Sequence, residues 1–229
     1  ILIWPLAILL ASKQISSLCL SGTIVVLAIY LIHITLKLPS KSRARILTCI
    51  ILIVSSVAFW ALYMQMGSSL ILYTQRCINL TILSHHIAAS SVASVNGIWL
   101  LMLSPIIVKI WKYLSIQNKE PKIYTKFLLG IILMAGAYFV LAVSAWQYLP
   151  GIKSNLSWVL ASYGLQTLGE LCLSPIGLAM ITEFTPAQHK SLMMGVWFLA
   201  TAIASLASGQ LAKLASIPKD SGQHVNIGH

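Results

Sequence analysis

Acidic side chains are nearly absent from this sequence. Only 4 of its 229 residues are Asp or Glu, and charged residues of both signs make up 8% of the chain, against about 25% in soluble globular domains. Hydrophobic residues account for 58% of the sequence, and its mean hydropathy is +0.88. This composition excludes an ordinary soluble domain and predicts an integral membrane protein.

Several motifs that carry chemistry are also missing. The four cysteines form no CxxC pair and no Cys/His ligand spacing, so we predict neither a disulfide framework nor a metal site. The sequence contains no catalytic triad, phosphate-binding glycine loop or Walker motif. These absences argue against an enzyme and against a transporter driven directly by ATP, and they imply no bound cofactor.

Long apolar runs fill most of the chain. Six of them approach the 20 or so residues that a membrane-spanning helix needs, and they are Ile15–Leu36, Ile46–Met66, Val95–Leu114, Tyr124–Trp146, Leu156–Ser174 and Ser191–Leu211. We expect a shorter opening run, Ile1–Ala11, to be the end of another helix. The runs are continuously apolar, which excludes the alternating pattern of a membrane β-barrel. The sequence therefore predicts an all-α, polytopic membrane protein.

The basic residues lie mostly in the connections between the runs and give a net charge of +11. If the runs alternate in direction, residues 37–45, residues 109–126 and Lys190 fall on one side with ten Lys and Arg residues, and the opposite side holds five. The side with more positive charge is expected to be cytoplasmic. Orientation in a membrane explains this charge better than binding to nucleic acid.

Glu170 is the only acid well inside an apolar run. A carboxylate near the bilayer centre costs on the order of 3 kcal/mol, so such a residue usually faces a bundle interior or a water-filled cavity. We favour a role in binding a proton or an amine. The alternative is that Glu170 lies near enough to the cytoplasmic end to snorkel or to form a structural pair.

A proline lies five residues after this glutamate. Pro175 has no amide hydrogen and disfavours helix at Ser174, so we expect the helix to break or bend just after Cys172. Broken helices near a polar residue are typical of transporters.

Other residues inside the runs support less specific predictions. Asn96 begins a run and taken alone would be a helix cap. Trp60 and Trp197 are packing residues by default, with a pocket wall as the alternative. Small residues recur every four positions in the last run and predict a face for close helix contact; they are Ala200, Ala204, Ser208 and Ala212.

Three stretches together resemble the proton-coupled oligopeptide transporter family, a branch of the major facilitator superfamily. The segment 169–199, GELCLSPIGLAMITEFTPAQHKSLMMGVWFL, is similar to the family's tenth helix, the following loop and the start of its eleventh helix. The segment 59–70, FWALYMQMGSSL, resembles the end of its seventh helix, and the segment 87–105, IAASSVASVNGIWLLMLSP, resembles the approach to its eighth. The resemblance covers about Ile15 to Ser216.

This resemblance implies a major-facilitator-type bundle of two six-helix halves around a central cavity. Residues 1–45 would hold linker helices between the halves, residues 46–216 the C-terminal bundle from the seventh to the eleventh helix, and residues 217–229 a polar tail. The N-terminal half, with the family's ExxER-type motif, and the twelfth helix have no counterpart in this sequence. We therefore expect the sequence to be a portion of a longer protein.

The resemblance also implies proton-driven symport of di- and tripeptides across a bacterial cytoplasmic membrane. The proton would be the coupling ion, and the partners would be small peptides, the lipid bilayer and the missing N-terminal half. Glu170 matches the glutamate expected to bind the peptide's amino terminus, and Asn96 matches an asparagine that holds the peptide backbone. Trp60, Trp197 and Phe198 match aromatic pocket positions.

The sequence departs from the family pattern at three places. Met64 stands where many members have a glutamate, Gly97 where many have a proline, and Glu183 where a basic residue is common. The first departure removes an acid near the implied pocket and bears on coupling and substrate range. Transport of another small substrate on the same fold, or a truncated membrane remnant without transport, is the alternative.

Overall fold

The computed structural model describes residues 13–82, 85–148 and 153–215. Its elements in chain order are α2 Lys13–Lys37, α3 Ser40–Tyr63, η1 Met64–Gly67, α4 Ser69–Cys77, β1 Thr81–Ile82, β2 His85–His86, α5 Ala89–Ala93, α6 Val95–Ile116, α7 Ile123–Tyr148, α8 Leu156–Phe184, η2 Ala187–His189 and α9 Lys190–Ala215. The expected opening helix end at 1–11 and the polar tail at 217–229 lie outside the described residues.

Each of the six long apolar runs falls in one helical segment, which confirms the predicted all-α class. Within the described ranges, five helical segments are long and apolar enough to cross a membrane: Ser40–Gly67, Ala89–Ile116, Ile123–Gln147, Leu156–Phe184 and Ala187–Leu214. The apolar part of α2 within the described residues, Ser21–Lys37, is shorter. The chain is thus a multi-pass helical bundle.

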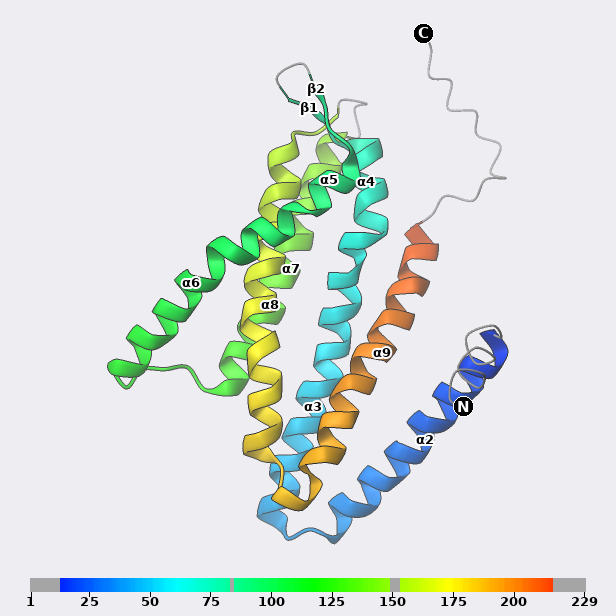
Figure 1. The fold of residues 1–229 in the computed structure, drawn as a ribbon, viewed down its shortest axis with the longest axis vertical. Helices are drawn as coiled ribbons and strands as arrows, with labels where there is room; N and C mark the ends of the chain where they lie inside the picture. Colours follow the sequence, from blue (N-terminus) through cyan, green and yellow to red (C-terminus); the bar gives the residue numbers. More distant parts are fainter. Residues whose placement is uncertain (1–12, 83–84, 149–152, 216–229) are drawn as a thin grey trace, which may run out of the picture.

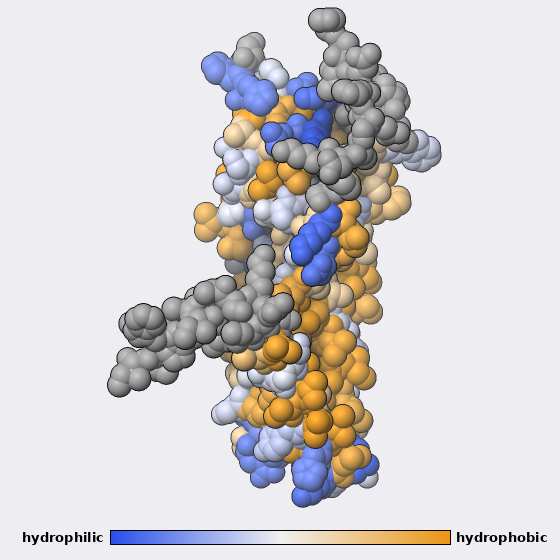
Figure 2. All heavy atoms as spheres, turned by 90° about the vertical axis from the view of Figure 1, so that its right-hand side faces the viewer, coloured by the Kyte–Doolittle hydropathy of each residue, from blue (hydrophilic) through white to orange (hydrophobic). Residues whose placement is uncertain are grey.

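The two ends of the bundle carry different connections (Figure 1). The α2/α3 and α8/α9 junctions lie at one end, and the α6/α7 connection points toward the same end. Strands β1 and β2, the last turn of α7 and the first turn of α8 lie at the other. Figure 2 shows mostly apolar side chains along the middle of the described surface, with hydrophilic ones gathered toward both ends. The connections that carry most of the basic residues, those of α2/α3, α6/α7 and α8/α9, thus lie toward one end of the bundle, as expected if the helices alternate in direction.

The region 67–94 holds two short helices and a hairpin. Helices α4 and α5 flank an antiparallel hairpin in which Thr81 pairs with His86. The chain at Ser154 joins this region, because its amide donates to the carbonyl of Cys77 and its carbonyl accepts from the amide of Asn79, both at 2.9 Å. These bonds tie the α4 end to the segment before α8.

Helices α7 and α8 make the closest pairing in the molecule because glycines meet at their crossing. A Cβ atom added at Gly169 would lie 2.9 Å from the carbonyl oxygen of Gly130, and one added at Gly130 would lie 2.3 Å from Leu173. Backbones approach this closely only where side chains are absent. The pairing fixes α8 at the centre of the bundle.

Helix α9 packs on α3 through the small-residue face predicted from its sequence. Ala200, Ala204 and Ser208 are all buried. Gln65, at the end of the α3 span, donates from Nε2 to the carbonyl and hydroxyl oxygens of Ser208, each at 2.9 Å. A buried amide in a membrane helix needs such partners, so this contact fixes the height of α9 against α3.

Helix α8 does not break after Cys172, because it runs without interruption from Leu156 to Phe184 with Pro175 inside it; a bend at this point stays a prediction. The proline lies on an exposed side of the helix, next to the exposed Ser174. Close packing of the other side of α8 against α7 holds the helical path. Prolines are tolerated within membrane helices when the surroundings compensate for the missing backbone bond.

Candidate functional site

The carboxylate of Glu170 meets side chains from two other helices. Tyr63, the last residue of α3, donates its hydroxyl hydrogen to Oε2 of Glu170 at 2.5 Å. The same hydroxyl oxygen accepts a hydrogen bond from Nδ2 of Asn96, in the first turn of α6, at 2.9 Å. Tyr63 therefore bridges the two polar residues that the sequence had singled out separately.

A fourth residue completes this hydrogen-bonded chain. Thr167 lies three residues before Glu170, so the two share a face of α8. Its hydroxyl lies 2.6 Å from Oδ1 of Asn96 and 2.8 Å from the carbonyl oxygen of Tyr163, to either of which it can donate. Asn96 thus uses both ends of its amide inside the bundle. It is not the cap of α6, since Ser94 precedes that helix and makes no side-chain cap bond.

Aromatic rings hold Tyr63 in place. Its ring stacks on that of Phe59 at 6.0 Å and 17°, and meets the indole of Trp60 edge-on at 5.4 Å. Phe59 is buried and would touch a Cβ at Gly169. Such pairs fix ring orientation, so the Tyr63 hydroxyl is positioned before any ligand arrives.

The indole nitrogen of Trp60 is buried and has no hydrogen-bond partner among the described residues. Buried donors in native proteins are nearly always paired, so an unpaired one indicates a site that takes an acceptor from water or a ligand. Trp60 lies beside Tyr63, and its role in a pocket stays a prediction.

Glu170 also lines a groove of about 410 Å³ between α6 and α8. The α8 wall is formed by Glu170, Leu171, Ser174, Pro175 and Leu178, and the α6 wall by Leu100, Ser104, Ile107, Val108 and Trp111. The walls are apolar apart from the carboxylate and two hydroxyl groups. Ligand sites have this character, with apolar walls and a few polar groups that fix orientation.

A charged cluster lies beyond the Trp111 end of the groove. The amine of Lys126 lies 4.8 Å from the centre of the Trp111 ring and pairs with the Glu120 carboxylate at 2.5 Å. The hydrogen bond from Lys126 lowers the pKa of the Glu120 carboxyl below its usual value. Glu170, in contrast, forms no ion pair with any of the described residues.

The two other aromatic residues expected at the site lie elsewhere. Trp197 is buried in the contact between α9 and α8, where its ring fills the space above Gly177. Phe198, on α9, is 65% exposed. Within the described part of the chain neither residue is hydrogen-bonded to Glu170 or stacked on the rings around it, so their roles in a pocket stay predictions.

Sequence reasoning missed Tyr63 and Thr167. The only local signal for Thr167 was its spacing of three residues from Glu170. Tyr63 had a similar spacing from Trp60 but lies 107 residues from its carboxylate partner. That pairing depends on how α3 and α8 cross, which neither segment encodes alone.

Among the described residues no cluster of three or more His, Cys, Asp or Glu side chains is suited to hold a metal ion. The side chains joined at the site are one carboxylate, one phenol, one amide and one hydroxyl. Together they can bind an ammonium group and hydrogen-bond to a neighbouring amide.

The chain is similar to known proteins over most of its length. The model of the POT family matches residues 7–227. The chain is 34% identical to the peptide transporter YePEPT of Yersinia enterocolitica over 76% of its length, and 33% identical to dipeptide and tripeptide permease A of Proteus mirabilis over 81%. These alignments cover 34% and 38% of the two relatives, so the chain spans little more than a third of their length.

The fold is also similar to those of solved transporter structures. A peptide transporter POT in complex with sulfate superposes with a TM-score of 0.75 at 30% identity, covering 93% of this chain and 44% of the other. A POT family transporter in complex with 5-aminolevulinic acid gives 0.76 at 25% identity, covering 93% and 45%. The fold of this chain is thus similar to less than half of each transporter.

Proposed function

We propose, from the premise that the chain belongs to the POT family, that it is the C-terminal portion of a proton-driven symporter of di- and tripeptides. The curated relatives are peptide transporters of bacteria, which supports a place in a bacterial cytoplasmic membrane. The residues 1–45, 46–216 and 217–229 would be the linker helices, the C-terminal bundle and a polar tail. The rest of the protein would supply the N-terminal half.

The observation that carries this proposal is the hydrogen-bonded chain from Glu170 through Tyr63 to Asn96. The Glu170 carboxylate would accept the charged amino end of a peptide, a charge-assisted interaction about twice as strong as a neutral hydrogen bond. Asn96, held between Thr167 and Tyr63, would offer its amide to the peptide backbone. The unpaired indole hydrogen of Trp60 would be available to a peptide carbonyl.

The Tyr63 hydroxyl gives the carboxylate a partner while the site is empty. An arriving ammonium group would compete for Oε2 or take the other carboxylate oxygen, and in either case Tyr63 keeps the carboxylate oriented. A carboxylate inside the bundle can also carry a proton, as acids in membrane transporters do. Met64 leaves no second acid next to Tyr63, so coupling would rest on Glu170 and on the other half. Alternating access would rock this bundle against that half.

The test is uptake of a labelled dipeptide by proteoliposomes that contain the full-length protein carrying this sequence, with an inward proton gradient. Glu170→Gln keeps the shape of the side chain and removes its charge. We expect uptake to fall roughly a hundredfold, since losing one member of a buried charge pair costs about 3 kcal/mol. Glu183→Gln, at the exposed end of α8, is the matched control and should transport normally.

An N-acetylated dipeptide isolates the role of the ammonium group. The unmodified protein should prefer the free dipeptide, and Glu170→Gln should lose that preference. Normal transport by Glu170→Gln would overturn the role of the residue. Because one related structure holds 5-aminolevulinic acid, a competition panel should include this small amine, and uptake of it without any dipeptide would favour the alternative cargo. No uptake of any substrate by the unmodified protein would favour a non-transporting remnant.

A further inference from the structure

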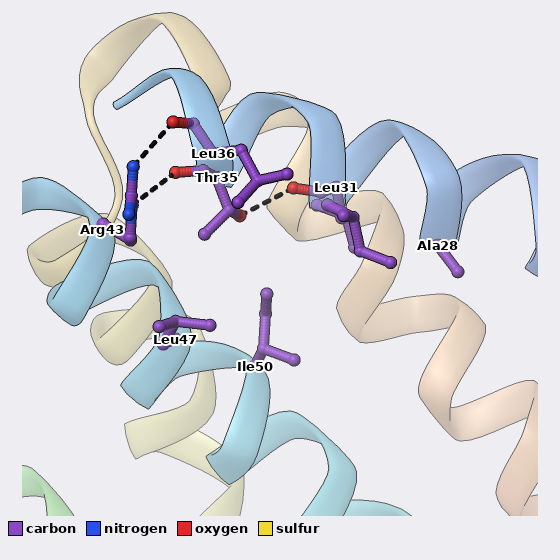
Figure 3. Close-up of a pocket in the computed structure, with 8 residues that line it drawn as sticks. Ala28, Leu31, Thr35, Leu36, Arg43, Leu47 and Ile50 are labelled. Carbon is purple, nitrogen blue, oxygen red and sulfur yellow. Dashed lines mark hydrogen bonds between the residues drawn. The ribbon is translucent and has the colours of Figure 1, made fainter. Parts of the chain in front are cut away.

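A second hollow lies between α2 and α3, far from the Glu170 groove. The two helices meet at residues 38–39 and diverge from there (Figure 1). The wedge between them has a volume of about 420 Å³ and is lined by Ala28, Leu31, Ile32, Thr35, Leu36, Arg43, Leu47 and Ile50 (Figure 3). From Ala28 to Thr35 it extends about 10 Å along the helix.

The polar group in the narrow end of the wedge is the guanidinium of Arg43. Its Nε donates to the carbonyl oxygen of Thr35 at 3.2 Å, and its Nη2 donates to that of Leu36 at 2.7 Å (Figure 3). Both carbonyls lie in the last turn of α2, where helix carbonyls lack their usual partners; that of Thr35 also accepts from the amide of Leu38 at 3.4 Å. The bonds fix the guanidinium where the helices meet. Nη1 has no hydrogen bond within the described residues, and an arginine in this state is well suited to bind phosphate oxygens.

Apart from Arg43, the lining of the wedge has no free side-chain group that could hydrogen-bond to water. Thr35 is the other polar residue of the lining, and its hydroxyl already donates to the carbonyl oxygen of Leu31 at 2.6 Å. A hollow with apolar walls does not hold ordered water, which needs two to four polar partners. Its occupant must therefore be apolar along the wedge and anionic at the Arg43 end.

The surroundings of Arg43 are strongly basic. Lys37, Lys41 and Arg45 lie within eight positions of one another, and no acid occurs in residues 13–119. Glu183, at the end of α8, lies near this group, since its backbone carbonyl accepts a hydrogen bond from Arg45. Among the described residues the ion pair of the bundle is Lys126–Glu120, so none of these four cations has a carboxylate partner.

We propose that this wedge binds one acyl chain of an anionic glycerophospholipid from the cytoplasmic leaflet. The phosphate would bind Nη1 of Arg43, with Lys37 or Lys41 as a second cation, and the chain would lie against Leu31, Leu47 and their apolar neighbours. Basic pockets between membrane helices on this side of a bilayer bind anionic head groups, and each basic residue contributes about 1 kcal/mol. The lipid would fasten α2 to α3, and the proposal does not depend on peptide transport.

The experiment is native mass spectrometry of the full-length protein in detergent, titrated with phosphatidylglycerol or with phosphatidylcholine of the same chain length. We expect one phosphatidylglycerol to bind more tightly than phosphatidylcholine. The double variant Lys37→Gln/Lys41→Gln leaves the hydrogen bonds of Arg43 to α2 intact. Its affinity for phosphatidylglycerol should fall about fivefold for each lysine that binds the head group. The control is Lys112→Gln/Lys119→Gln in the α6/α7 region, which should bind normally.

A third variant separates the chain from the head group. Ala28→Phe fills the wedge without changing any charge, and it should abolish the single tight lipid. Equal affinity for the two lipids, or an unchanged tight site in Ala28→Phe, would overturn the proposal. The absence of any bound lipid would also overturn it and would favour another occupant, such as residues 1–12, a second copy of the chain or a further part of the protein.

Discussion

Helices α6 and α8 are neighbours that contact each other, yet they are buried to very different degrees. In the most apolar part of Leu156–Phe184, 56% of the residues are buried, against 6% in the most apolar part of Ala89–Ile116, although the second segment is the more hydrophobic; α6 itself has no buried residue. Glycines in α8 let α7 and α9 approach it, whereas α6 presents bulky side chains such as Leu101 and Met102 to its surroundings. In a membrane, apolar character marks contact with lipid as well as with the core. Small residues mark the centre of the bundle better.

The largest effect should come from filling the contact at the centre. Gly169→Leu would push atoms into the carbonyl of Gly130 and the ring of Phe59. We expect a loss of about 3 kcal/mol in the free energy of unfolding, typical of severe overpacking. Gly136→Leu in α7, with open space around it, is the control. Thermal unfolding in detergent measures both, and equal midpoints would contradict the central position of α8.

Two leucines give the next largest contrast. Leu173 of α8 is completely buried and Leu101 of α6 is 76% exposed. We expect Leu173→Ala to cost about 2 kcal/mol by leaving a cavity, and Leu101→Ala to cost less than about 0.5 kcal/mol, as for other surface changes. The same unfolding assay compares them. A large loss in Leu101→Ala would indicate that α6 packs against a part of the protein outside the described residues.

The smallest effect on stability should come from the site that joins the two helices. Tyr63→Phe removes the hydroxyl between Glu170 and Asn96 and should cost about 1 kcal/mol. Transport should respond more clearly, with a fivefold to tenfold rise in KM for a dipeptide (an effect of about 1 kcal/mol) and a smaller change in kcat.

Tyr73→Phe is the control for that substitution, since the hydroxyl of Tyr73 donates to Ser144 at 2.9 Å and takes no part in the bonds to Glu170. It should lower stability to a similar extent and leave KM unchanged. An equal rise in KM for the two variants would show that Tyr63 acts on the fold alone.

The sequence determined the helical, multi-pass class, the approximate bounds of the six long helices and the small-residue face of α9. Each of these features lies within one helix or is repeated in every helix, so local composition and residue spacing are enough to predict it. The cost of an acid inside an apolar run was equally local and was enough to single out Glu170. The expected break at Pro175 failed because backbone preference alone does not include the neighbours that hold α8.

Only the tertiary structure decided what Glu170 contacts. Tyr63, Asn96 and Thr167 come from three helices, and the hydroxyl that joins them is placed by the glycine contact of α7 with α8 and by the ring of Phe59. The same holds for the wedge at Arg43, which depends on the angle between α2 and α3. Contacts between distant segments depend on how whole helices pack, and that packing is a property of the assembled bundle.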